Sequence, residues 1–346
     1  MQKLKDYLSS IPKDYDPENI YKDVLPLLVE ENLLTVINQS ISFKDFHKNL
    51  FELAKLPHGI GLGVSLMAQV NIAGRIIFLA AKNLNHPVYL KLLNGLTKGE
   101  YIISLGVSEP DWKGRLSNIK TNITFNNGKY QLDGEKSFFT NGYHSTHFLV
   151  VARMDGNYKV VLLEKENTGL EITKFTLPFA KEATHCRIKM NSVQINEEDI
   201  LNLDYSKYAE NLRLSEMLSL STVFCGYAIS TLEQIKANSK LVSILKEEED
   251  KQKEILRCKT LVHMLYSRIL ELSELKDNLE EIELKEFFPY GTELVSDEFY
   301  KTLSNIFPKE EIEPYFIEKQ LFQYRDILNE SYIRRAARSA SGLIKT

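Results

Sequence analysis

The order of the hydrophobic periodicities is the feature that most constrains how this chain can fold. From residue 1 to about residue 99, apolar residues recur about every 3.6 positions, which predicts helices. Short apolar runs between turn residues follow from about 101 to 195, and the helical period returns after residue 202. This order excludes a Rossmann fold or a barrel of alternating strands and helices, because in those folds the two kinds of element alternate along the chain.

The middle region reads as a series of strands joined by short turns. Its apolar runs include residues 149–151, 160–163 and 187–190. The turn signals between the strands are Asn126-Asn127-Gly128, Asp155-Gly156-Asn157 and Asn167-Thr168-Gly169. We therefore predict an α+β protein with three domains. These are an α-helical domain over 1–100, a β-domain over 101–200 and a helical bundle over 201–346.

Composition and charge exclude several classes of protein. The 346 residues are 43% hydrophobic, which is enough to bury a core and excludes a mostly disordered chain. The net charge of −4 argues against a nucleic-acid binder that relies on phosphate contacts. The cysteines Cys186, Cys225 and Cys258 are widely spaced and odd in number. They therefore indicate neither a disulfide framework nor a metal knuckle, and they fit a reducing cytoplasm.

No signal peptide, membrane span or metal site is expected. Residues 1–15 are polar and lack the apolar core of a signal peptide. The most apolar stretch, 65–81, is interrupted by Gln69, Asn71 and Arg75, so we predict a buried helix there. The histidines are scattered, and His144 and His147 form a close pair without a third ligand. These observations predict a cytoplasmic protein without a resident metal.

Two segments at the start of the β-region resemble a known family. Residues 104–121 read SLGVSEPDWKGRLSNIKT, and residues 130–142 read YQLDGEKSFFTNG. Together they resemble the flavin-contacting β-domain of the acyl-CoA dehydrogenases, with its TEPGAGSD…IKT and LNGEKxWITNG stretches. The spacing through Ile119-Lys120-Thr121 matches without a gap. The resemblance extends over most of the chain and implies a helical N-terminal domain, a central antiparallel β-barrel and a C-terminal helical bundle.

The resemblance also implies an FAD cofactor and residues that line it. Val107 and Ser108 would line the flavin, Phe138 would replace the family's tryptophan, and Thr140 would lie near the reactive edge. The alternative is that Phe138 and Phe139 are ordinary strand residues. Strand alternation cannot place two adjacent side chains on one face, so one of them must face outward or into a ligand.

The family's reaction needs a carboxylate that abstracts the α-proton of an acyl thioester while the flavin takes the β-hydride. Most members carry this glutamate in a YEGTSxIxR segment, which corresponds here to ILNESYIRR at 327–335. The catalytic position is Leu328, and the carboxylates nearest to it in sequence are Asp326 and Glu330.

A minority branch, including the isovaleryl type, carries the glutamate ten residues before a glycine in the first C-terminal helix. Glu216 precedes Gly226 by ten residues and is predicted to be the base. It lies in a run, 214–224, that has no other charged residue. The alternative is a surface ion pair with Arg213, three residues earlier on the same helix.

Several family motifs are altered, mainly those for the outer, dinucleotide half of FAD. The RxxFG motif falls at 242–246 and is absent, and in the QxxGGxG motif at 301–307 Ser304-Asn305 replace the paired glycines. The family's Ser-Asp pair is Gly114-Arg115, and the arginine after the helix-borne base is Met217. We therefore expect FAD to bind more weakly than is usual, with Lys301 as a candidate for replacement charge.

The function expected from the resemblance is FAD-dependent α,β-dehydrogenation of an acyl thioester, carried by CoA or by acyl carrier protein. An electron-transfer flavoprotein or a similar acceptor would take the electrons, and the C-terminal bundle would form a homodimer or homotetramer. Two alternatives stay open. One is a related flavin-dependent oxidase or monooxygenase, and the other is a non-catalytic scaffold that has lost FAD.

Overall fold

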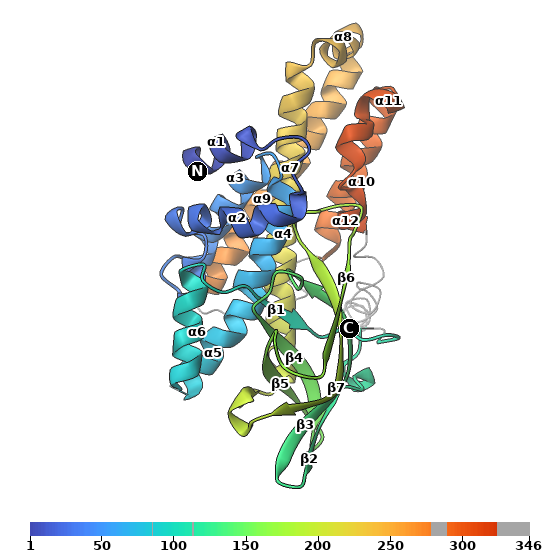
Figure 1. Cartoon of the computed structure of the whole chain (residues 1–346). Coiled ribbons are helices and arrows are strands. Elements are labelled where there is room, and N and C mark those ends of the chain that lie inside the picture. Colours follow the sequence, from blue (N-terminus) through green and yellow to red (C-terminus); the bar gives the residue numbers. More distant parts are fainter. Residues whose placement is uncertain (85, 113, 278–288, 324–346) are drawn as a thin grey trace, which may run out of the picture. The chain divides into compact units, whose positions relative to one another are not determined.

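The computed structural model describes residues 1–346 except 85, 113, 278–288 and 324–346 (Figure 1). Its order of elements confirms the predicted sequence of helices, strands and helices. Helices occupy the chain up to Thr97, strands follow from Ile103 to Leu201, and a long helix begins at Ala209. The contacts between Cα atoms group the chain into two compact units. Unit 1 comprises 1–42, 61–177 and 181–216, and unit 2 comprises 43–60, 178–180 and 217–346.

The helices before the sheet include one apolar stretch that runs through a π-helical segment. The helices are α1 (Gln2–Ser10), α2 (Pro17–Glu30), α3 (Phe43–Ala54), α4 (Gly59–Met67), the π-helical Ala68–Gly74, α5 (Arg75–Leu84) and α6 (Pro87–Thr97). Gly59–Lys82 is long and apolar enough to cross a membrane, but 78% of its most apolar window is buried in the protein. Gln69 and Asn71 within it are buried, and the Gln69 amide donates to the carbonyl oxygen of Tyr101 at 3.0 Å. The stretch is therefore built as a core helix, as predicted.

The strands form one mixed sheet in unit 1. They are β1 (Ile103–Gly106), β2 (Asn122–Asn126), β3 (Lys129–Thr140), β4 (His147–Met154), β5 (Asn157–Glu164), β6 (Leu170–Phe175), β7 (His185–Ile195) and β8 (Ile200–Leu201). The order is β6-β7-β3-β2-β4-β5-β8, and β1 pairs with β4. Asn127-Gly128 and Asp155-Gly156 join β2 to β3 and β4 to β5 with positive φ angles throughout. Tight hairpins need this conformation, so the two turn predictions are confirmed.

The prediction of a closed antiparallel β-barrel is wrong, because the sheet is open. Among the described residues, the end strands β6 and β8 do not pair with each other. Closure would need a full ladder between the two ends, and β8 has only 2 residues. The sheet is also mixed, because β1 runs parallel to β4, with Ile103 opposite His147.

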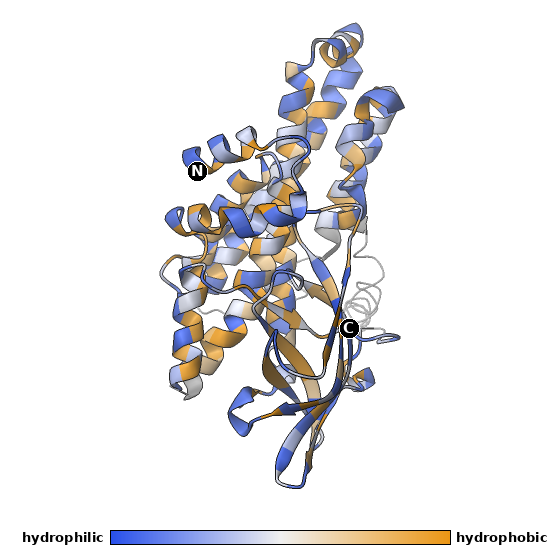
Figure 2. Ribbon diagram, viewed as in Figure 1, coloured by the Kyte–Doolittle hydropathy of each residue, from blue (hydrophilic) through white to orange (hydrophobic). Residues whose placement is uncertain are grey.

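The core of the sheet lies on β3, β4, β5 and β7. Phe148 to Ala152 of β4 are all buried, so both faces of this strand are covered. Figure 2 shows apolar residues along β4 and polar residues at the tip of the β2–β3 hairpin. Phe139 of β3 and Cys186 of β7, which are opposite each other in register, belong to the same core cluster.

The helices after the sheet are mostly in unit 2. They are α7 (Ala209–Ala237), α8 (Ser239–Glu247), α9 (Glu249–Asp277), α10 (Pro289–Ile306), α11 (Lys309–Ile312) and α12 (Lys319–Gln323). At Gly226 of α7 the backbone of α3 comes close, because a Cβ atom there would lie 2.4 Å from the Phe51 carbonyl oxygen. His47 of α3 is buried between the hydroxyls of Ser219 and Ser273, at 3.0 and 2.8 Å. Both contacts join α3 to the C-terminal helices within this unit.

Candidate functional site

A buried ion pair joins the two family-like segments. Lys136 of β3 lies 2.7 Å from Glu109, which follows β1, and their side chains are 0% and 3% exposed. Lys136 also donates to the Val107 carbonyl oxygen at 3.1 Å. The Glu109 carboxylate accepts the backbone N–H groups of Lys120 and Thr121 at 2.6 and 3.0 Å. This network fixes the loop between β1 and β2 against the middle of β3.

Burial and hydrogen bonding act in opposite directions on the pKa values of this pair. Burial lowers the pKa of Lys136 to about 8, although the Glu109 carboxylate works in the opposite direction. Burial also works to raise the pKa of Glu109, but hydrogen bonds from Lys136, Thr121 and Lys120 outweigh it and hold that pKa below its usual range. Both residues lie in the family-like segments, in SEP and GEK, but sequence reasoning assigned them no role. Their pairing is a contact across 27 residues that no local pattern reveals.

Of the four residues predicted to line a cofactor, two lie in the loop after β1 and two lie on β3. The Ser137 N–H donates to the Ser108 carbonyl oxygen at 2.8 Å, so Val107 and Ser108 lie against β3 just before Phe138. Phe138 and Thr140 are two residues apart on β3 and therefore share a face. The role of these residues toward a cofactor stays a prediction.

Phe138 and Phe139 point to opposite faces of the sheet, as alternation predicts, although the register of β3 against β7 shifts between Lys136 and Phe139. Phe139 is buried in the core, whereas Phe138 is half-buried and packs against two other rings. Its ring centroid lies 5.4 Å from that of Phe175 and 4.6 Å from that of His185. The rings of Phe175 and His185 are 5.8 Å apart and inclined by only 18°. We call Phe138, Phe175 and His185 the aromatic face.

His185 is the polar member of the aromatic face. It starts β7 directly opposite Thr140 and is 3% exposed. Its Nδ1 atom is buried without a hydrogen-bond partner among the described residues. Burial lowers the pKa of His185 to about 4, so the imidazole is neutral at pH 7. Sequence reasoning weighed histidines only as metal ligands, and no motif marks this one.

The residues Thr140-Asn141-Gly142 at the end of β3 are explained by the backbone geometry of that position. Asn141 has a φ of 67°, a left-handed conformation that turns the chain out of the strand. Its side-chain amide donates to the Ser65 carbonyl oxygen of α4 at 2.8 Å. The next residue is Gly142, and a side chain would not fit there because its Cβ atom would lie 2.4 Å from the Cys186 sulfur. The triplet therefore anchors the end of β3, including Thr140, to α4.

Comparison with known proteins identifies this region. The family model described as "Acyl-CoA dehydrogenase, middle domain" matches residues 104–193, which run from β1 to β7. Residues 104–193 are therefore similar to the middle domain of the acyl-CoA dehydrogenases. The match includes both family-like segments, the buried ion pair and the aromatic face.

Solved structures extend the likeness to the rest of the chain. The butyryl-CoA dehydrogenase of Megasphaera elsdenii matches with a TM-score of 0.72 at 15% identity, over 98% of this chain and 96% of that one. A glutaryl-CoA dehydrogenase of Mycobacterium smegmatis in complex with FADH2 matches at 0.72 and 13% identity, over 88% and 83%. PigA with FAD and proline matches at 0.77 and 15%, over 97% and 96%. The chain therefore has the acyl-CoA dehydrogenase fold.

Within this fold, Glu216 lies in the second turn of α7. Its carboxylate is 2.9 Å from a guanidinium nitrogen of Arg213, and its side chain is 27% exposed. The ion pair that the sequence allowed is thus formed, and the carboxylate is half-buried rather than buried. Leu328, Asp326 and Glu330, on the segment where most acyl-CoA dehydrogenases carry the base, lie outside the described residues.

The residues that the sequence aligns with the outer, dinucleotide half of the family site lie on helices. Residues 242–246, in place of RxxFG, lie in α8 and include no arginine. Ser304 and Asn305, in place of the paired glycines, are exposed on α10. Lys301 is also exposed, with its Nζ 4.0 Å from Glu298. These positions offer little that is preorganised for a pyrophosphate.

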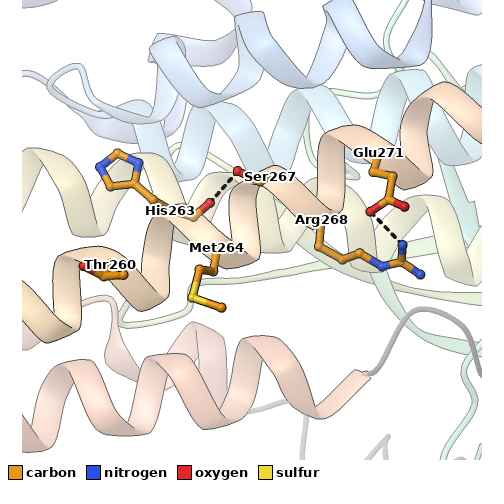
Figure 3. A pocket seen from close by; sticks show the side chains of 6 residues that line it. All are labelled: Thr260, His263, Met264, Ser267, Arg268 and Glu271. Atoms are coloured by element: carbon orange, nitrogen blue, oxygen red, sulfur yellow. Dashed lines mark hydrogen bonds and ion pairs between the residues drawn. The ribbon is translucent and has the colours of Figure 1, made fainter.

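Among the described residues, other surface features add no second candidate site. A shallow depression on α9 is lined by side chains of that one helix (Figure 3), and it contains the Arg268–Glu271 pair, at 2.7 Å. Among the residues that the structure describes, no three His, Cys, Asp or Glu side chains gather as metal ligands would. All three cysteines are buried free thiols.

The two buried histidines predict how stability depends on pH. Burial lowers the pKa of His47 to about 3 and that of His185 to about 4, whereas an unfolded histidine titrates near 6.5. Between about pH 6.5 and 4 the unfolded chain therefore binds protons that the folded chain does not. The free energy of unfolding is therefore highest above pH 6.5 and falls as the pH drops. A pKa shift as large as that of His185 accounts for a loss of roughly 3 kcal/mol. Urea unfolding at pH 7 and pH 4.5 should show this loss, and H185N should show a smaller one. If H185N and wild type lose the same unfolding free energy between pH 7 and pH 4.5, the lowered pKa of His185 is not a source of the pH dependence.

Proposed function

We propose that this protein is an FAD-dependent acyl-thioester dehydrogenase in which Glu216 abstracts the α-proton. The observation that carries the proposal is the joining of the two family-like segments by the Glu109–Lys136 pair. That pair holds Val107 and Ser108 beside the strand that carries Phe138 and Thr140. The relatives in solved structures include acyl-CoA dehydrogenases and flavin complexes, which supports the same class of chemistry here.

The residues around the aromatic face fit the isoalloxazine half of FAD. A half-buried aromatic face offers flat packing for a planar ring, and an orphaned imidazole nitrogen offers a polar contact. Val107, Ser108, Phe138 and Thr140 are the residues that would hold the ring. When bound, FAD supplies the acceptor for the hydride that leaves the β-carbon.

The protein's own part of the chemistry is proton removal. The Glu216 carboxylate would take the α-proton and become a carboxylic acid. Arg213 holds the carboxylate through a charge-assisted hydrogen bond, which makes it a positioning residue. Substrate carbonyl polarisation can come from backbone N–H groups, because these need no particular side chain. The acyl carrier is CoA or acyl carrier protein, and the electron acceptor is an electron-transfer flavoprotein or a similar protein.

Cofactor occupancy gives a direct prediction. Because the outer half of the site lacks its arginine and glycines, the purified protein should contain FAD at partial occupancy, and occupancy should rise when FAD is added. The absorbance of bound flavin relative to protein measures this. Failure of FAD and FMN to bind at tens of micromolar, measured by fluorescence quenching, would leave only the scaffold alternative.

The changes in the motifs for the dinucleotide half of FAD favour a second candidate function, a non-catalytic scaffold that has lost FAD. Exposed Ser304 and Asn305 on α10 would suit a protein that has kept the fold and lost FAD. A colourless protein that stays colourless with added FAD would support this candidate. Oxygen consumption by the reduced flavoprotein would instead favour an oxidase or monooxygenase of the same fold.

Assembly into a homodimer or homotetramer is a further prediction. Leu256 and Met264 on α9 and Leu294 on α10 are large apolar side chains more than 60% exposed in the single chain. Helices with such faces usually bury them against a second copy. Light scattering after size exclusion should therefore give at least twice the 39.9 kDa chain mass. A single monomer peak at micromolar concentration would contradict the prediction.

A further inference from the structure

The Nδ1 atom of His185 is a buried polar atom next to residues that are predicted to line the flavin. His185 is opposite Thr140 on the face of the sheet away from the core, because its neighbour Cys186 points into the core cluster. The ring centroid of Phe138 lies 4.6 Å from that of the imidazole, and the Phe138 side chain is only half-buried. Buried polar atoms in native proteins nearly always have a partner, so an orphaned one calls for an explanation.

Other histidines of the chain show what satisfied imidazoles look like. Both ring nitrogens of His47 meet serine hydroxyls, and the Nδ1 of His147 meets the Thr146 hydroxyl at 2.9 Å. His86 and His144 each have an unpartnered nitrogen, but these residues are only half-buried. His185 combines nearly complete burial with an orphaned nitrogen.

We propose that His185 holds the isoalloxazine ring of the bound flavin through a hydrogen bond at Nδ1. This inference rests on the proposed function, since it needs a flavin at the aromatic face. Phe138 and Phe175 can offer only ring surfaces, whereas a flavin has a polar edge with both donors and acceptors. A neutral imidazole carries one N–H and one lone pair, so Nδ1 can serve either need in the appropriate tautomer. The orphaned atom is then completed by the ligand.

Three substitutions separate the role of this one atom from the role of the ring. H185N keeps a polar atom close to the position of Nδ1, H185Q places its amide nearer to the position of Nε2, and H185F keeps only the packing. The inference predicts that H185N binds FAD with an affinity near that of wild type. H185Q and H185F should bind it about tenfold or more weakly, as expected for the loss of one buried hydrogen bond. H147N is the matched control, because its imidazole already has a partner in the same sheet, and it should bind FAD like wild type.

FAD affinity is measured by quenching of flavin fluorescence, and the absorption spectrum of the bound flavin is recorded for each variant that keeps the wild-type circular dichroism. A second measurement needs no substitution. The ¹⁵N resonance of His185 Nδ1 in the wild-type protein, assigned by its absence in H185N, should shift when FAD is added, whereas that of His147 should not.

The outcomes are distinct. Wild-type affinities and spectra for H185Q and H185F, or a loss in H185N as large as that in H185F, would overturn the role of His185 while leaving the proposed function intact. An unchanged Nδ1 resonance on saturation with FAD would do the same. Failure of the wild-type protein to bind FAD at all would overturn the proposed function and this inference with it.

Discussion

Glu216→Gln is expected to abolish reduction of bound flavin by an acyl thioester while leaving the fold and FAD binding intact. The amide is nearly isosteric with the carboxylate, and the residues proposed to contact the flavin lie elsewhere, on the sheet and in the loop after β1. A neutral amide cannot take the α-proton, and a positioned base typically contributes roughly 10²–10⁴-fold to the rate. Anaerobic stopped-flow measurement of flavin bleaching would record the loss.

Control variants decide between Glu216 and its rivals. Asp326→Asn and Glu330→Gln change the two carboxylates that flank Leu328, and both should reduce flavin like wild type. Leu328→Glu, which restores the commoner family position, should partly rescue Glu216→Gln. If Glu216→Gln reduces flavin at the wild-type rate while either control is inactive, the base has been misassigned.

The ion pair with Arg213 makes a weaker, separate test of how Glu216 works. Because the guanidinium lies 2.9 Å from the carboxylate, it fixes where the base points. Arg213→Gln should therefore lower the rate of flavin reduction less than Glu216→Gln does. It should leave the FAD affinity unchanged, as befits a residue that acts through another.

Local patterns in the sequence were enough to predict the order of elements and the hairpin turns. Asn127-Gly128 and Asp155-Gly156 could be assigned because two-residue hairpins need positive φ at both positions, which few residue types adopt. The opposite orientation of Phe138 and Phe139 was expected from the period of a strand. These features depend on neighbours within a few residues.

Features that depend on distant contacts were missed or predicted wrongly. Closure of the sheet depends on whether β6 meets β8, which no pattern within either strand specifies. The pairing of Glu109 with Lys136 and the orphaned nitrogen of His185 arise only when separate strands are brought into register. A lone histidine in an alternating strand gives no signal of its own, although its place opposite Thr140 could be read once the β3–β7 register was known.

Lys136→Met is expected to destabilise the fold more than any of the substitutions proposed at Glu216, Arg213 or His185. It leaves the Glu109 carboxylate buried without its cation, and breaking a buried pair in this way typically costs about 3–5 kcal/mol. The Val107 carbonyl also loses its donor, so the loop beside Phe138 should loosen and FAD affinity should fall. Urea unfolding at pH 7 and FAD titration measure the two effects.

The double variant Glu109→Gln/Lys136→Met should be more stable than Lys136→Met alone. It removes the stranded charge, and the glutamine oxygen can still accept a backbone N–H from Lys120 or Thr121. The interaction free energy between two residues in contact, as measured in a double-mutant cycle, is typically about 0.5–3 kcal/mol. Lys253→Met is the surface control, because its partner Glu249 is 82% exposed, and it should change stability by no more than about 0.5 kcal/mol.

The pH dependence of the same variants has a definite sign. In the wild type the lowered pKa of Glu109 contributes stability that is present above the ordinary carboxyl pKa of 4.5 and is lost as the pH falls through the folded value. Without Lys136, burial is no longer opposed by the cation, so the pKa of Glu109 should rise and protonation should relieve the stranded charge. The stability gap between Lys136→Met and wild type should therefore narrow from pH 7 toward pH 4. A gap that is constant with pH, or a double variant as unstable as Lys136→Met, would mean that lost packing of the lysine stem, rather than the buried charge, sets the effect.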